Sequence, residues 1–211
     1  MADFVGIAFD LAFKYRNPAI ILADGVIGQM MEKVVLPEQR TRLTDEEVIA
    51  RCPWATTGRT HHRTPNIITS LELDPAEMEK RNIHLQKKYA EIEENEVRFE
   101  ELHCEDAEYL IVAFGSCARI AQKAMEMARE EGIKVGLLRP ITLWPFPSKA
   151  IAARAAQVKG ILTVELNAGQ MVEDVRLAVE CKVPVEHFGR LGGIVPDPDE
   201  VITALKEKLI K

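Results

Sequence analysis

From Tyr109 onward the chain alternates short apolar runs with amphipathic segments, and this alternation constrains its fold more than any other feature. The apolar runs are continuous, which is typical of strands buried on both faces of a parallel sheet. We therefore expect an α/β domain over 106–211, with a largely parallel or mixed five-stranded sheet and helices on both faces. The pattern predicts strands at 109–115, 134–140, 160–166 and 183–189, and helices over 117–128, 148–158, 171–179 and 201–209.

The N-terminal residues predict a helix followed by a strand. Apolar residues recur at helical spacing over 5–13, Asn17 and Pro18 end that run, and 19–22 reads as a short apolar strand. A strand of this kind belongs inside a sheet, yet no residues precede the helix to supply neighbouring strands. We therefore interpret residues 1–36 as a partial α/β unit, the last part of a larger domain.

Residues 37–105 are predicted to be a connector that contains one long helix. Asp74 is a predicted N-cap, Pro75 suits the first helical position, and Glu77 follows the cap by three residues. A helix over 75–94 would be about 30 Å long. Its apolar stripe is narrow and suits packing along one surface, in this chain or on a partner subunit. The stripe consists of Met78, Leu85, Ile92 and Phe99.

A basic, hydroxyl-rich run over 51–66 precedes this helix. Its adjacent residues His61 and His62 would point to opposite sides of an extended chain, which argues against shared metal ligation. Two interpretations remain open, a contact with a phosphate or an acidic partner and a solvated loop. The sequence favours the loop.

The composition excludes several classes of protein. A net charge of −6 gives no electrostatic signature for nucleic-acid binding, and no apolar run approaches the roughly 20 residues of a membrane helix. No secretory signal opens the chain, so we expect a soluble, cytoplasmic protein. The four cysteines include no CxxC pair and no histidine at ligand spacing, which argues against a zinc site or an iron–sulfur cluster. We interpret them as reduced thiols, with Cys117 and Cys181 as core residues on helix faces.

Ligands of parallel sheets meet the carboxyl ends of the strands. Ser116 and Asn167 lie there as predicted helix caps or near-caps, and the N–H groups behind them are suited to an anion. Arg139 and Glu165 are expected to pair across the same crevice. The alternative is that these caps and this ion pair have a structural role only, and that the two glycines at 192–193 only make a turn. The sequence favours this structural alternative. The candidate ligand-binding residues are Ser116, Arg139, Glu165, Asn167 and Gln170.

The sequence contains no complete active site. The first predicted strand is followed by GSCARI, which lacks the later glycines of a dinucleotide-binding loop. A Walker loop, a GxSxG elbow and a recognisable Cys–His arrangement are also absent from the sequence. His187 lies in a predicted strand, and we interpret it as a structural histidine rather than a catalytic base. We therefore predict no catalytic residue and no metal ligand in this chain.

Six ordered segments carry a family resemblance, namely 14–37, 54–59, 66–79, 109–121, 136–147 and 164–179, the last followed by FGRLGG at 188–193. They resemble the α subunit of 2-oxoacid:ferredoxin oxidoreductases, most closely the 2-oxoisovalerate (3-methyl-2-oxobutanoate) type. The resemblance covers essentially the whole chain. It implies a transketolase C-terminal-like fold for 106–211, and it identifies 1–36 as the remnant of a pyrimidine-binding thiamine diphosphate domain.

The resemblance implies oxidative decarboxylation of a branched 2-oxoacid to acyl-CoA, with reduction of ferredoxin. Thiamine diphosphate and iron–sulfur clusters would serve the full complex and lie mostly or wholly outside this chain, and coenzyme A would be a co-substrate. The implied partners are β and γ or δ subunits, ferredoxin and further copies of the chain, without nucleic acid or membrane. The expected role of this chain is structural, in subunit assembly, and we expect the isolated chain to be inactive.

A second hypothesis belongs to a different class of function. The chain would then be a stand-alone assembly or anion-binding α/β module without catalysis. Its ligand would contact Ser116, Arg139 and Asn167.

Overall fold

The computed structural model describes residues 1–56 and 66–210. His61 and His62 lie outside the described residues. The chain divides into two compact units, one of Met1–Ile21 with Glu32–Lys88 and one of Leu22–Met31 with Tyr89–Lys211. The second, C-terminal unit contains the predicted α/β domain.

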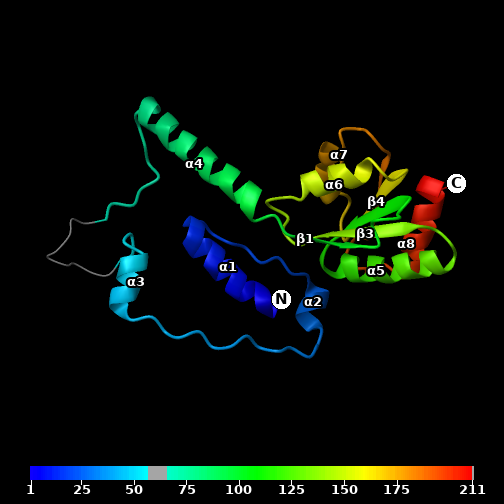
Figure 1. Ribbon diagram of the computed structural model, residues 1–211, viewed down its shortest axis with the longest axis horizontal. Helices are drawn as coiled ribbons and strands as arrows, with labels where there is room; N and C mark the ends of the chain where they lie inside the picture. Colours follow the sequence, from blue (N-terminus) through cyan, green and yellow to red (C-terminus); the bar gives the residue numbers. More distant parts are fainter. Residues whose placement is uncertain (57–65, 211) are drawn as a thin grey trace. The chain divides into compact units, whose positions relative to one another are not determined.

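The C-terminal unit is built on a five-stranded sheet (Figure 1). Four strands are parallel, as the continuous apolar runs predict, and the strand order is β1-β3-β2-β4-β5. The edge strand β1 pairs antiparallel with β3, so the sheet is mixed. The strands are β1 (Phe99–Leu102), β2 (Tyr109–Ala113), β3 (Val135–Pro140), β4 (Gly160–Glu165) and β5 (Val185–Gly189).

Helices cover both faces of this sheet (Figure 1). On one face lie α5 (Gly115–Glu130) and α8 (Pro198–Leu205), and α8 continues as a π-helical turn over Lys206–Ile210. On the other face lie α6 (Ser148–Ala155) and α7 (Met171–Val179). The predicted fold class is therefore confirmed.

The core follows from the alternation of side chains along each strand. On β2, Ile111 packs with the apolar faces of α5 and α8, whereas Leu110 and Val112 pack with α6 and α7. All three side chains are almost fully excluded from solvent. Because both faces are buried, most positions of the central strands are apolar, which is why the sequence shows runs rather than alternation.

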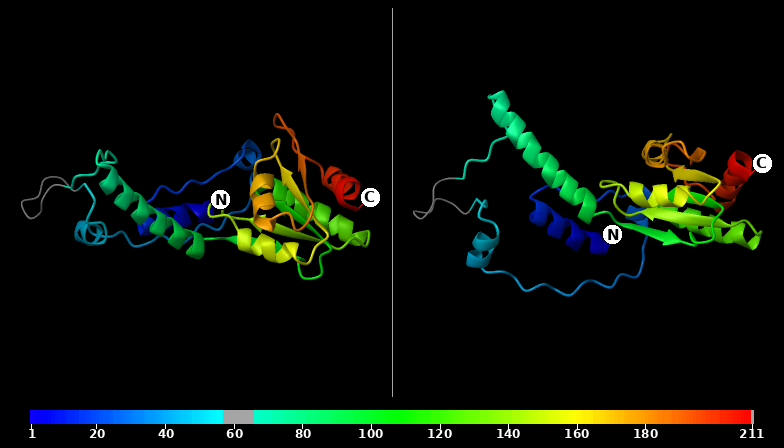
Figure 2. Two further views of the ribbon diagram at one scale, coloured as in Figure 1. Left: turned by 90° about the horizontal axis from the view of Figure 1, so that it is seen from above. Right: turned by 45° about the horizontal axis from the view of Figure 1, so that its top comes forward.

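The C-terminal unit also includes a segment from far earlier in the chain. Leu22–Met31 carries the short helix α2 (Gly25–Gln29), which contacts α5. The unit continues from Tyr89 through the last turns of α4 (Pro75–Asn95), where Ile92 is buried. Figure 2 shows α4 from two further sides as one continuous helix, as its cap and stripe predict.

The other unit is helical among its described residues. It contains α1 (Ala2–Tyr15), α3 (Asp45–Arg51) and the first turns of α4. The ring of Phe13 stacks on Trp54, with centroids 6.1 Å apart. The helix α1 confirms the predicted helix over 5–13.

Three local predictions were wrong. Residues 19–22 form no strand, because the described residues of their surroundings offer no strand to pair with, and Ile20 is 80% exposed. Phe99 belongs to β1 rather than to the helical stripe, because α4 ends at Asn95. Cys181 is exposed just after the C-cap of α7, where the chain has already left the helix face, whereas Cys117 is buried as expected.

None of the helices in the described part of the chain is long and apolar enough to cross a membrane.

Candidate functional site

The strand order places a topological switch point at the carboxyl end of the sheet, where a crevice is expected. After β2 the chain turns toward β3, and after β4 it turns toward β5, although β2 and β4 are neighbours. The two loops therefore diverge between β2 and β4. Open α/β sheets bind their ligands at such a point.

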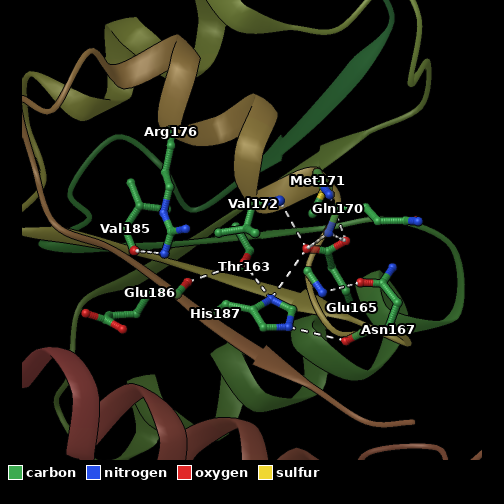
Figure 3. A network of polar contacts seen from close by, with 11 residues as sticks. Thr163, Glu165, Asn167, Gln170, Met171, Val172, Arg176, Val185, Glu186 and His187 are labelled. Carbon is green, nitrogen blue, oxygen red and sulfur yellow. Dashed lines mark hydrogen bonds and ion pairs between the residues drawn. The ribbon is translucent and has the colours of Figure 1, made fainter. Parts of the chain in front are cut away.

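Glu165, the last residue of β4, fills the α7 side of this crevice. Its side chain is fully buried, and its Oε2 accepts hydrogen bonds from the backbone N–H of Met171 at 2.8 Å and of Gln170 at 3.2 Å. Its Oε1 accepts one from the N–H of Val172 at 3.1 Å (Figure 3). These N–H groups have no partner within the helix, and together with the helix dipole they favour a negative charge. A carboxylate of the protein thus occupies the position of a bound anion.

His187 on β5 joins the same network (Figure 3). Its Nδ1 lies 3.2 Å from Thr163 Oγ1 and 3.4 Å from Glu165 Oε1, and its Nε2 lies 3.3 Å from the carbonyl oxygen of Asn167. Both ring nitrogens therefore have partners within the fold. This arrangement agrees with the interpretation of His187 as a structural histidine.

The turn after β4 is held tightly against β5. The side-chain Oδ1 of Asn167 accepts a hydrogen bond from the N–H of Gly169 at 2.7 Å. A Cβ at Gly189 would lie 2.2 Å from the carbonyl oxygen of Asn167 and 2.6 Å from His187 Nε2. Only glycine fits there, because real Cβ atoms do not approach backbone oxygen so closely. Asn167 therefore stabilises the turn through its side chain and packs its carbonyl group against β5.

A second carboxylate lies at the start of α5. The hydroxyl of Ser116 donates a hydrogen bond to Asp24 Oδ2 at 2.6 Å, and the N–H of Ile27 donates one to Asp24 Oδ1 at 2.8 Å. Burial raises the pKa of the Asp24 carboxyl, but these bonds and further backbone N–H donors outweigh it, so its pKa lies below its ordinary value. The predicted anion position at Ser116 is therefore also filled from within the protein.

Cys117 lies near both carboxylates. Burial, followed by the charges of Asp24 and Glu165, raises the pKa of its thiol to about 11. The thiolate is the nucleophilic form of cysteine, so this environment suppresses its reactivity. Cys117 is a core residue beside an acidic crevice.

Arg139 does not reach this crevice network. Its guanidinium lies 2.9 Å from Glu100 Oε2, and Glu100 is its neighbour across the antiparallel pair of β1 and β3. The expected ion pair between Arg139 and Glu165 was wrong, because Glu165 is already held by the backbone of α7. The structure brings Glu165, Asn167 and Gln170 together and leaves Arg139 on β3, paired with Glu100 of the edge strand β1.

Sequence reasoning missed Asp24 and Glu100 as partners. The only local signal at Asp24 is an aspartate followed by glycine at a helix start, and it says nothing of Ser116. Among the described residues no group of His, Cys, Asp or Glu is placed to hold a metal ion. The crevice presents carboxylates where a phosphate would bind, so its residues do not fit the diphosphate of a cofactor or the phosphates of coenzyme A. This is evidence against the anion-binding alternative.

Comparisons with known proteins agree on one group of enzymes. Residues 107–201 match the family described as pyruvate:ferredoxin oxidoreductase core domain II. The chain is 44% identical to the ketoisovalerate oxidoreductase subunit VorB of Methanothermobacter marburgensis, over 98% of this chain and 57% of that subunit. It is 32% identical to the 2-oxoglutarate synthase subunit KorA of Archaeoglobus fulgidus, over 90% of this chain and 53% of the relative.

A solved structure supports the same relationship. The 2-oxoglutarate:ferredoxin oxidoreductase from Magnetococcus marinus, with 2-oxoglutarate, coenzyme A and succinyl-CoA bound, superposes with a TM-score of 0.57 at 25% identity, covering 64% of this chain and 24% of that one. The chain spans only 57% of the length of the VorB subunit that it matches. The chain is therefore similar to the ketoisovalerate oxidoreductase subunit VorB, and its residues 107–201 match the pyruvate:ferredoxin oxidoreductase core domain II.

Proposed function

We propose that this chain is part of an α-type subunit of a 2-oxoacid:ferredoxin oxidoreductase that acts on branched 2-oxoacids. The identity to VorB, 44% over 98% of the chain, carries the proposal. The identity to a 2-oxoglutarate synthase subunit is lower, 32% over 90% of the chain. This difference favours 2-oxoisovalerate over 2-oxoglutarate as the substrate of the complete enzyme.

The proposed reaction is the oxidative decarboxylation of the 2-oxoacid to acyl-CoA, with electrons passed to ferredoxin. Thiamine diphosphate, iron–sulfur clusters and coenzyme A would be bound mostly or wholly by other parts of the enzyme. Glu165 and Asp24 support this assignment, because they already neutralise the helix N-termini that would hold phosphates. We assign no catalytic residue to this chain.

The proposed role of the chain is structural. Residues 106–211 would be a transketolase C-terminal-like domain, 37–105 a connector, and 1–36 the remnant of a pyrimidine-binding domain. The α1 residues Val5, Phe9 and Phe13 are each at least 50% exposed, and large apolar side chains in that state are typical of a surface that a partner covers. The partners would be the β and γ or δ subunits and further copies of the chain, in the cytoplasm.

Mixing the chain with its cognate β and γ subunits tests this proposal. We expect a stable complex by native mass spectrometry, in which 2-oxoisovalerate does not drive reduction of ferredoxin. Failure to form any complex would contradict the assembly role. Ferredoxin reduction without a longer α chain would contradict the assignment of the catalytic groups to other parts of the enzyme.

A further inference from the structure

Asp24 caps one helix and contacts the start of another. Its Oδ1 accepts from the N–H of Ile27 at 2.8 Å, which caps α2, and its Oδ2 accepts from the hydroxyl of Ser116 at 2.6 Å. Ser116 lies 92 residues further along the chain, in the first turn of α5. One carboxylate therefore links two helix N-termini that are distant in sequence.

The start of α5 has no side-chain cap of its own. Its N-cap residue is Phe114, whose side chain makes no capping hydrogen bond. The backbone N–H groups at a helix start and the positive end of its dipole are stabilised by a carboxylate. Asp24 supplies that charge from outside the helix.

The segment 22–31 has little apolar burial to hold it in place. Leu22 is 68% exposed, Met30 46% and Met31 99%. Only Asp24, Val26 and Ile27 in this segment are partly buried. The residues on both sides of it, Met1–Ile21 and Glu32–Lys88, belong to the other unit. The polar contacts of Asp24 must therefore contribute much of what keeps the segment on the C-terminal unit.

We infer that Asp24 is the positioning residue that docks residues 22–31 onto the C-terminal unit, and that the start of α5, with Ser116, is its docking surface. Ser116 then serves an intrachain contact rather than a ligand. The segment bound to this surface is residues 22–31 of the same chain, which already contact it in the structure. The inference does not depend on the proposed enzyme function.

Hydrogen exchange of the complete chain tests this inference. Ser116→Ala removes the hydroxyl contact between the two segments, keeps the backbone N–H of residue 116 on Asp24, and leaves the cap of α2 intact. A hydrogen bond to a charged group contributes enough that exchange at the amides of Gly28 and Met30 should become about tenfold to hundredfold faster. Exchange in β2 and β4 should not change. The matched control is Ser148→Ala, an exposed serine in the first turn of α6, which should leave the segment unaffected.

Variants at Asp24 separate docking from capping. Asp24→Ala removes both contacts and should accelerate exchange more than Ser116→Ala does. Asp24→Asn keeps an oxygen for Ile27 but faces Ser116 with an NH₂ group, which cannot accept from the N–H of Ser116, so it should restore only part of the protection. The double variant Asp24→Ala with Ser116→Ala should exchange no faster than Asp24→Ala alone, because the two residues share one interaction. Unchanged exchange of the segment in Ser116→Ala, or equal acceleration throughout β2 and β4, would overturn the inference.

Discussion

Replacing Glu165 with glutamine should destabilise the C-terminal unit strongly. The carboxylate is fully buried, and both of its oxygens accept backbone N–H bonds, from Gln170, Met171 and Val172. In Glu165→Gln an NH₂ group takes the place of one oxygen. That group presents a donor to a backbone donor, so at least one buried N–H of α7 loses its partner.

The structure sets the size of this effect. A buried donor left without a partner costs about 1–3 kcal/mol. Loss of the negative charge at the start of α7 removes its interaction with the helix dipole, which contributes up to about 2 kcal/mol in buried geometry. We therefore expect the free energy of unfolding to fall by about 2–4 kcal/mol. Glu173→Gln removes an exposed carboxylate from the first turn of the same helix and should cost less than about 1 kcal/mol.

Urea unfolding measures both variants. The chain has two tryptophans, and in a Trp54→Phe background the fluorescence of Trp144 reports on the C-terminal unit. The shift of the unfolding midpoint at constant slope gives the change in free energy. If Glu165→Gln costs no more than Glu173→Gln, the backbone contacts do not stabilise α7 and our reading of the network is refuted.

Three further predictions concern other contacts of the C-terminal unit. Gly189→Ala should lower the urea midpoint by the equivalent of more than about 2 kcal/mol, because its Cβ would meet the carbonyl oxygen of Asn167 at 2.2 Å. At pH 7.5 a thiol reagent should modify exposed Cys181 rapidly and Cys117, with its pKa raised to about 11, only on unfolding, as peptide mass spectrometry would show. The pKa of Asp24 is lowered on folding, so its ionised carboxylate stabilises the fold above its ordinary pKa. That contribution is lost as the pH falls through the lowered pKa, and the stability advantage over Asp24→Asn should disappear in acid.

Each of these predictions has a control or a contrary outcome. Gly28→Ala places a Cβ in open space in α2 and should not destabilise the chain, and an equal loss there would contradict the steric argument. Buried Cys104, whose pKa burial also raises to about 11, should behave like Cys117, and rapid labelling of either thiol in the folded chain would contradict their burial. A difference between parent and Asp24→Asn that grows toward acid pH would have the wrong sign for a lowered carboxyl pKa.

Much of the fold could be predicted because it follows from local periodicity. The apolar runs correspond to β2, β3, β4 and β5. The cap and stripe of α4 predicted the last residue of that helix to within a residue or two. The edge strand β1 could not be predicted, because its sequence FEEL has two charged residues and lies next to a helical pattern. It forms a strand only because β3 offers a free edge.

The candidate site was predictable in position but not in its contacts. The residues after β4 were expected at the crevice, and Glu165, Asn167 and Gln170 lie there. Their partners differ from expectation, since Glu165 binds the backbone of α7 and Arg139 binds Glu100. Residue type limits what a side chain can bind, but several partners satisfy a carboxylate equally well, and only the packed chain decides among them.

From Tyr109 onward the sequence by itself determined the order of strands and helices and the class of sheet, because apolar periodicity is a property of residues that are near in the chain. The tertiary structure alone decided that two carboxylates, Glu165 and Asp24, occupy the helix N-termini at the carboxyl end of the sheet. Asp24 and Ser116 are 92 residues apart, and no local pattern encodes a contact at that separation. The sequence suggested Ser116 and Asn167 as caps or near-caps of an anion site, but the N-caps of α5 and α7 are Phe114 and Gln170. The negative charge at both helix starts is supplied by the chain itself.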